Sequence, residues 1–93
     1  MKKYQLHFSP SPLTQPVFDT GGGKVARITV SHDAEGTQPV TFYDREGKQV
    51  AHYQVHPMRS PWTITYANRD SFSFTNGLQI NTGNCTVDLL VIY

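Results

Sequence analysis

The fold class of this 93-residue chain is decided by its last nine residues, Cys85-Thr86-Val87-Asp88-Leu89-Leu90-Val91-Ile92-Tyr93. Apolar side chains occupy every second position from Cys85 to Tyr93, which is the period of a β-strand with one buried face. Leu90 and Ile92 make the opposite face apolar as well. Because a strand that is apolar on both faces is typical of the middle of a sheet or of an interface, we predict a central strand here.

The same two-residue period recurs in the rest of the chain, and turn-forming sequences separate the segments. Asn76-Gly77, Thr82-Gly83-Asn84 and Asp44-Arg45-Glu46-Gly47 are typical turn sequences. No segment keeps a helical period for three turns without a Gly, a Pro or a β-branched cluster. Eight or so short strands separated by turns predict an all-β protein, an antiparallel β-sandwich that is jelly-roll-like.

The alternation also predicts which side chains are buried. In the segment 24–31 we expect Ala26, Ile28 and Val30 to share the core face. Further along, the polar residues 68–70 are expected to separate two strands. The aromatic residues of these two strands alternate with Thr and Ser, so we expect them in the core rather than on a platform for sugars or bases: Trp62, Tyr66, Phe72 and Phe74.

Residues 9–23 differ from the rest of the chain in their proline and glycine content. Pro10, Pro12 and Pro16 each lack a backbone donor, so no central strand is expected here. Gly21-Gly22-Gly23 supplies a flexible joint. We therefore divide the chain into an N-terminal strand with an extended Pro/Gly-rich arm at 1–23 and a β-sandwich domain at 24–93. An ordinary surface loop is the alternative to an arm that reaches a neighbouring subunit.

Composition argues against several classes of partner. Eight Lys and Arg against seven Asp and Glu give a net charge of +1, which does not predict binding to nucleic acid. No stretch approaches the roughly 20 apolar residues of a membrane span, so no membrane partner is expected. Cys85 is the only cysteine, and the basic start of the chain lacks the apolar run of a signal peptide. These features predict synthesis in the cytoplasm.

No pattern in the sequence predicts an enzyme, a cofactor or a metal site. His52 and His56 are four residues apart on or beside a strand, which separates them by about 13 Å, too far to share one zinc ion. Cys85 begins a strand on its apolar face with no base beside it, so we expect a core residue. Gly21-Gly22-Gly23 lacks the Gly-Lys-Ser/Thr of a phosphate loop. No catalytic residue is therefore assigned.

The stretch 40–93 resembles small β-rich structural proteins of tailed bacteriophages, of the capsid decoration or cement type. The resemblance lies in a strand ending in Asp with a Gly shortly after, a Phe-rich segment leading to Asn-Gly-Leu, a Thr-Gly turn and a closing strand that ends in Tyr. The segments that carry it are Val40-Thr41-Phe42-Tyr43-Asp44 with Gly47, Phe72-Ser73-Phe74-Thr75-Asn76-Gly77-Leu78, Thr82-Gly83, and Thr86-Val87-Asp88-Leu89-Leu90-Val91-Ile92-Tyr93.

This resemblance implies a virion protein, made in the host cytoplasm, that stabilises the capsid by bridging subunits. Its implied partners are the major capsid protein or other virion subunits, and a homo-oligomer, a trimer or dimer, is expected by analogy. On this interpretation the contact residues come from both ends of the chain: Tyr4, Leu6, Phe8, Leu13, Val17, Phe18, Leu90 and Ile92. A carbohydrate- or host-surface-binding module and a head–tail or tail component are the alternatives.

Overall fold

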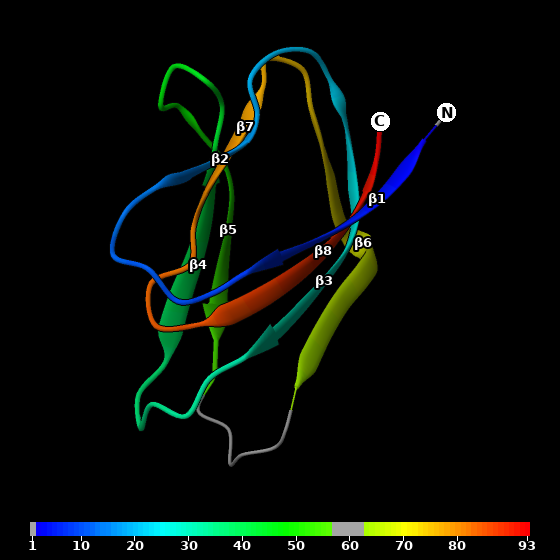
Figure 1. Cartoon of the computed structure of the whole chain (residues 1–93). Helices are drawn as coiled ribbons and strands as arrows, with labels where there is room; N and C mark the ends of the chain where they lie inside the picture. Colours follow the sequence, from blue (N-terminus) through cyan, green and yellow to red (C-terminus); the bar gives the residue numbers. More distant parts are fainter. Residues whose placement is uncertain (1, 57–62) are drawn as a thin grey trace.

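The computed structural model describes residues 2–56 and 63–93, and these residues form eight strands and no helix (Figure 1). None of them, therefore, forms a helix that could cross a bilayer. The strands are β1 (Lys3–Phe8), β2 (Gln15–Phe18), β3 (Gly23–Ser31), β4 (Gln38–Tyr43), β5 (Gln49–Val55), β6 (Ile64–Phe74), β7 (Leu78–Asn81) and β8 (Thr86–Ile92).

The strands form two four-stranded sheets, which confirms the predicted all-β sandwich. One sheet has the order β1-β8-β3-β6 and the other the order β2-β7-β4-β5, and all the neighbours pair antiparallel. The predicted central position of the C-terminal strand is confirmed, since β8 lies between β1 and β3 (Figure 1). The two chain ends lie close together at one end of this sheet.

The core lies between the inner faces of the two sheets. On β8 the inner residues are Val87, Leu89 and Val91, as the alternation predicted. Cys85, just before β8, is fully buried, in agreement with the core position expected for it. Among the described residues, the buried apolar side chains are Val25, Ile28, Val30, Val40, Phe42, Val55, Phe74, Leu78, Ile80, Cys85, Val87, Leu89 and Val91.

Irregular pairing between β3 and its neighbours corrects two predictions. The register shifts between Val25 and Arg27, so Val25 enters the core in place of Ala26, while Ile28 and Val30 remain buried as expected. Opposite this shift, residues 68–71 are extra residues within one continuous strand, β6, and do not separate two strands. Asn68 takes a positive φ of 58°, a conformation that Asn tolerates better than most residues.

The predicted aromatic core is largely confirmed. Phe74 is buried, and Tyr66 and Phe72 are partly buried and pack against the core. Trp62 lies outside the described residues.

The extended arm predicted within residues 9–23 is not confirmed. Residues 15–18 form β2, an edge strand paired with β7. The preceding segment is held by Thr82, whose hydroxyl accepts a hydrogen bond from the Ser11 amide (3.1 Å) and donates one to the Ser9 carbonyl (3.1 Å). The Ser11 amide also donates to the Gly83 carbonyl (3.0 Å). These bonds hold the segment on the sandwich.

The glycine triplet is required by close packing and is not a flexible joint. A Cβ on Gly22 would lie 2.8 Å from the Phe74 carbonyl, and one on Gly23 would lie 2.7 Å from the Ile92 carbonyl. Contacts this short are not tolerated between non-bonded atoms, so a larger residue would force the backbones apart. Only glycine therefore allows the chain to enter β3 at this point.

Candidate functional site

The predicted contact residues fall on two different surfaces of the sandwich. Residues directly opposite each other in an antiparallel pair have side chains on the same face. Tyr4, Leu6 and Phe8 pair with Val91, Leu89 and Val87, so these three face inward and are partly buried. Leu90 and Ile92 pair with Gln5 and Lys3, which places them on the outer face. The predicted set is therefore not one continuous surface.

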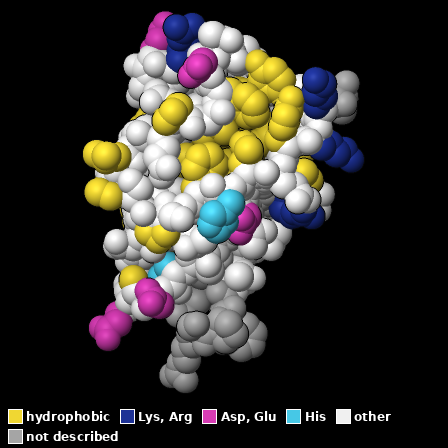
Figure 2. Space-filling model, in the orientation of Figure 1, with side chains coloured by type: hydrophobic (Ala, Val, Ile, Leu, Met, Phe, Trp, Pro, Cys, Tyr) yellow, Lys and Arg dark blue, Asp and Glu magenta, His cyan; other side chains and the backbone are white. Residues whose placement is uncertain are grey.

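An aromatic cluster fills the gap between the two sheets along β1 and β2. We call Tyr4, Phe18, Phe74 and Tyr93 the aromatic rim. Phe18 stacks on Tyr93 with centroids 4.6 Å apart and on Phe74 at 5.7 Å, and Tyr4 meets its edge at 5.9 Å. Tyr93 is 42 % exposed. The rim therefore keeps aromatic carbon accessible to a partner. Figure 2 shows a hydrophobic patch in the upper part of the molecule.

Two further predicted contact residues, Val17 and Leu13, lie on β2 and in the connection before it. Val17 is at an irregular step in the pairing of β2 with β7, which is why both Val17 and Phe18 pack against the core. Leu13, in the connection from β1 to β2, is 72 % exposed. Its amide donates to the Ser11 hydroxyl at 3.1 Å, so its backbone is held while its side chain faces solvent. Leu13 is thus the most exposed of the large apolar side chains that the structure describes.

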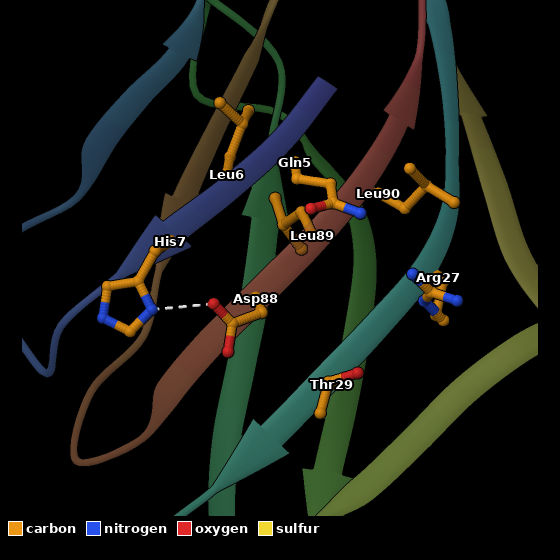
Figure 3. A pocket seen from close by; sticks show the side chains of 8 residues that line it. All are labelled: Gln5, Leu6, His7, Arg27, Thr29, Asp88, Leu89 and Leu90. Carbon is orange, nitrogen blue, oxygen red and sulfur yellow. Dashed lines mark hydrogen bonds and ion pairs between the residues drawn. The ribbon is translucent and has the colours of Figure 1, made fainter. Parts of the chain in front are cut away.

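The second surface is a shallow hollow on the outer face of β1, β8 and β3 (Figure 3). It encloses about 390 Å³, and one of its lining residues, Leu90, lies between Gln5 on β1 and Arg27 on β3. Beside it, His7 Nδ1 lies 2.7 Å from a carboxylate oxygen of Asp88. Both of these side chains are more than half exposed, so water screens the pair and its contribution to stability is small.

The side chains that line the hollow are not arranged as a catalytic triad. Asp88 is opposite His7 on one side and opposite Thr29 on the other. His7 and Thr29 are therefore two strands apart, about 9–10 Å, whereas an imidazole must contact the hydroxyl that it activates. The Thr29 hydroxyl instead lies 3.4 Å from that of Thr65. The arrangement offers hydrogen-bonding groups around an apolar centre, which is the character of a contact surface.

The side chains of His32 and His52 make structural hydrogen bonds. The Ala34 amide donates to His32 Nδ1 (3.1 Å), so the proton of this buried ring is on Nε2, which donates to the His56 carbonyl (3.0 Å). His52 contacts the Thr41 hydroxyl at 2.9 Å and the Gln54 amide at 2.7 Å. Among residues 2–56 and 63–93, no three His, Cys, Asp or Glu side chains are grouped as metal ligands.

The environment of Cys85 disfavours the charged thiolate form of its side chain. Burial raises the pKa of the Cys85 thiol, because the charged thiolate loses its solvation in the core. A thiol with a raised pKa forms little of the thiolate that acts as nucleophile. Its position therefore fits a packing role.

Sequence reasoning found some of these surface residues and missed others. Tyr4 and Phe18 were predicted as contact residues and lie together in the rim. Tyr93 was placed on the apolar face of its strand and considered as a contact residue, but it was not among the eight contact residues assigned above. The polar lining of the hollow was missed, because it depends on the pairing of β1 with β8.

No protein-family model, no curated protein and no solved structure matches this chain.

Proposed function

We propose that the chain is a structural protein of a bacteriophage virion, a capsid decoration or cement protein that stabilises the shell by bridging its subunits. The observation that carries this proposal is that the sandwich leaves large apolar side chains exposed to solvent, Tyr93 in the aromatic rim and Leu13 in the connection from β1 to β2. Apolar side chains that remain accessible in this way gain free energy when a partner covers them.

The strand pairing supports the same proposal. Each strand of the first half pairs with its counterpart in the second half, β1 with β8, β2 with β7, β3 with β6 and β4 with β5. A long hairpin of this kind, rolled so that β3 also meets β8 and β4 also meets β7, is the connectivity of a jelly roll. We infer this connectivity, which occurs in viral capsid domains, although a fold alone does not define a function.

The mechanism of stabilisation would be mass action. A protein that binds the assembled shell but not its free subunits stabilises the shell by a free energy that rises with the logarithm of its concentration relative to its dissociation constant. The sandwich supplies a base that does not need to reorganise on binding, which lowers the entropic cost of association. The rim and Leu13 would contact the major capsid protein or another virion subunit.

Electron microscopy with immunogold labelling tests the location. Virions purified from a lysate that contains this chain are labelled with an antibody against it. We expect gold over the head. Gold confined to the tail or the head–tail junction would support the tail alternative, and virions without label would contradict the proposal.

An add-back assay tests the contact surface. Shells stripped of the chain are mixed with purified protein, and their disruption temperature is measured by calorimetry. We expect wild type to raise it and Leu13→Ser to raise it less, because Leu13 is exposed and its loss leaves the fold intact. Leu90→Ser, on the outer face, is the matched control. If Leu90→Ser fails and Leu13→Ser does not, the outer face is the contact surface instead.

A further inference from the structure

One edge of the sandwich lacks the features that protect the others. The two sheets have four edge strands, β1, β6, β2 and β5. β2 contains Pro16 and an irregular register, β5 has a register shift opposite Phe42 and Tyr43, and β6 carries the extra residues 68–71. Among the described edge strands, β1 alone pairs with its neighbour without interruption, over six residues. A regular exposed edge is a template for another strand.

The free backbone groups of this edge can be assigned to particular residues. Lys2 and Tyr93 exchange both of their backbone hydrogen bonds, at 3.1 and 2.8 Å. Because hydrogen-bonded and non-hydrogen-bonded pairs alternate in an antiparallel ladder, Lys3, Gln5 and His7 direct their N–H and C=O groups away from β8. All three residues are exposed, and their side chains share the outer face with Leu90 and Asp88. Figure 3 shows Gln5 and His7 on this strand.

We propose that β1 pairs with β1 of a second copy of this chain, in an antiparallel register centred on Gln5. In this register Gln5 is opposite Gln5 of the second copy, and Lys3 is opposite His7 of the second copy. All three outward-directed residues then exchange backbone hydrogen bonds across a two-fold axis, as a symmetric interface requires. The sheet β1-β8-β3-β6 becomes one continuous sheet through both copies.

The side chains of β1 are complementary to themselves in this register. Lys3 is opposite His7 of the second copy, whose imidazole is hydrogen-bonded to Asp88 at 2.7 Å, so the ammonium group is directed towards a carboxylate. On the inner face, Tyr4 is opposite Leu6 of the second copy. Both are only partly buried in the single chain, and the pairing covers them. Registers centred away from Gln5 leave at least one of the three outward residues unpaired.

This inference deepens the proposed function, because it names the symmetric oligomer expected of a decoration protein as a two-fold dimer. Its test, however, needs only the purified chain. A monomer in solution would overturn the dimer and leave the shell assays to decide the function. Absence from the virion would overturn the function and leave the dimer intact.

Sedimentation velocity over a micromolar concentration range tests the dimer with two matched variants. Gln5→Pro removes the N–H that points away from β8 and breaks no hydrogen bond to β8. Proline is tolerated in edge strands at positions where the N–H faces solvent. We expect its dimerisation to be at least about tenfold weaker, since a hydrogen bond is lost in each copy. Gln5→Ala keeps the N–H and is expected to dimerise nearly as wild type does. A wild-type monomer or trimer, or a dimer unaffected by Gln5→Pro, overturns the proposal.

A charge reversal tests the register. Lys3→Glu brings a carboxylate towards Asp88 of the second copy and is expected to weaken the dimer several-fold. Lys24→Glu makes the same change on the same face but on β3, away from the edge, and is expected to have little effect. Equal effects of the two variants would contradict this register.

Hydrogen exchange provides a measurement that does not depend on a variant's folding. In the wild-type dimer, the amides of Lys3, Gln5 and His7 are expected to exchange more slowly as the protein concentration rises. If these amides exchange rapidly at every concentration, the edge is not paired and the proposal fails, even where Gln5→Pro does not fold.

Discussion

The two long sides of the sandwich are both filled by aromatic residues, but they are closed in different ways. On the β5–β6 side, Tyr53 lies 4.9 Å from Tyr66 between ring centroids, and its hydroxyl donates to the Asp70 carbonyl. Tyr66 donates in the opposite direction, to the Gln54 carbonyl at 3.5 Å. Two hydroxyls therefore join the edge of one sheet to the edge of the other on this side.

The β1–β2 side lacks this link among its described residues. Here the Tyr93 hydroxyl donates to the Thr20 carbonyl (2.7 Å), which holds the end of the chain to the loop before β3, and the outward groups of β1 stay free. The same type of residue thus links the two sheets on one side and leaves the sheet edge open on the other. The difference teaches that aromatic content alone does not distinguish a closed edge from an open one.

The largest expected effect is on the closed side. Phe42 is fully buried, with ring centroids 4.9 Å from Phe72 and 6.1 Å from Tyr53. Phe42→Ala should lower the free energy of unfolding by about 3–5 kcal/mol, because a buried ring leaves a cavity. Urea denaturation measures the change. Phe42→Leu, as control, should cost about 1.5 kcal/mol or less. A loss below 1 kcal/mol for Phe42→Ala would show that this side is not tightly packed.

A smaller effect is expected on the open side. Phe18 is the centre of the aromatic rim but only partly buried, so Phe18→Ala should cost about 2 kcal/mol in the same denaturation experiment. The midpoint should fall while the slope of the transition stays unchanged. If Phe18→Ala costs as much as Phe42→Ala, the rim is part of the core and the contrast between the two sides is wrong.

The sequence predicted the sandwich because apolar and polar residues that alternate over several positions fit a half-buried β-strand and few other structures. It could not predict where the alternation slips. The bulge at Ala26 places its neighbour Val25 in the core instead. Both residues are apolar, so the residue types alone do not show which of the two is buried. Pro16 excluded a central strand but not an edge strand, and β2 is an edge strand. The exclusion of a central strand was therefore correct, whereas the flexible joint expected at the glycines was not found.

The site was less predictable than the fold. The hollow and the free edge both depend on which residues of β1 lie opposite β8, and these strands are at opposite ends of the chain. Alternation gives the face of each residue but not the register between distant strands. Leu90 and Ile92 were therefore grouped with Tyr4 and Leu6, although they lie on opposite faces of one sheet.

Gln15 offers a change that should increase stability on the open side. It is opposite the buried Ile80, and its side-chain Nε2 is buried with no hydrogen-bond partner within residues 2–56 and 63–93. Gln15→Met should raise the free energy of unfolding by about 1 kcal/mol, because the cost of the unpaired donor is removed. Gln49→Met, at an exposed position of β5, is the control and should change stability by less than about 0.5 kcal/mol. A destabilised Gln15→Met would mean that the amide has a partner in solution.

The smallest expected effect tests the tyrosine link on the closed side. Tyr53→Phe removes one hydrogen bond to the carbonyl of Asp70, an exposed residue, so near neutral pH we expect a loss of about 0.5 kcal/mol. Calorimetry or urea denaturation measures it. The more specific result is the pH dependence. Burial, with added contributions from Asp70 and Tyr66, raises the pKa of Tyr53 from 10.0 to about 12.

Above pH 10 the unfolded chain therefore releases this proton while the folded chain retains it. The unfolded state then binds fewer protons, so stability is fully present below pH 10 and falls as the pH rises towards 12. Wild type should lose more stability between about pH 9 and about pH 11 than Tyr53→Phe does. Tyr66, whose pKa is raised by burial and then by Asp70, keeps part of the dependence in the variant. Identical alkaline slopes for the two proteins would show that Tyr53 is solvated and that the β5–β6 side is as open as the other.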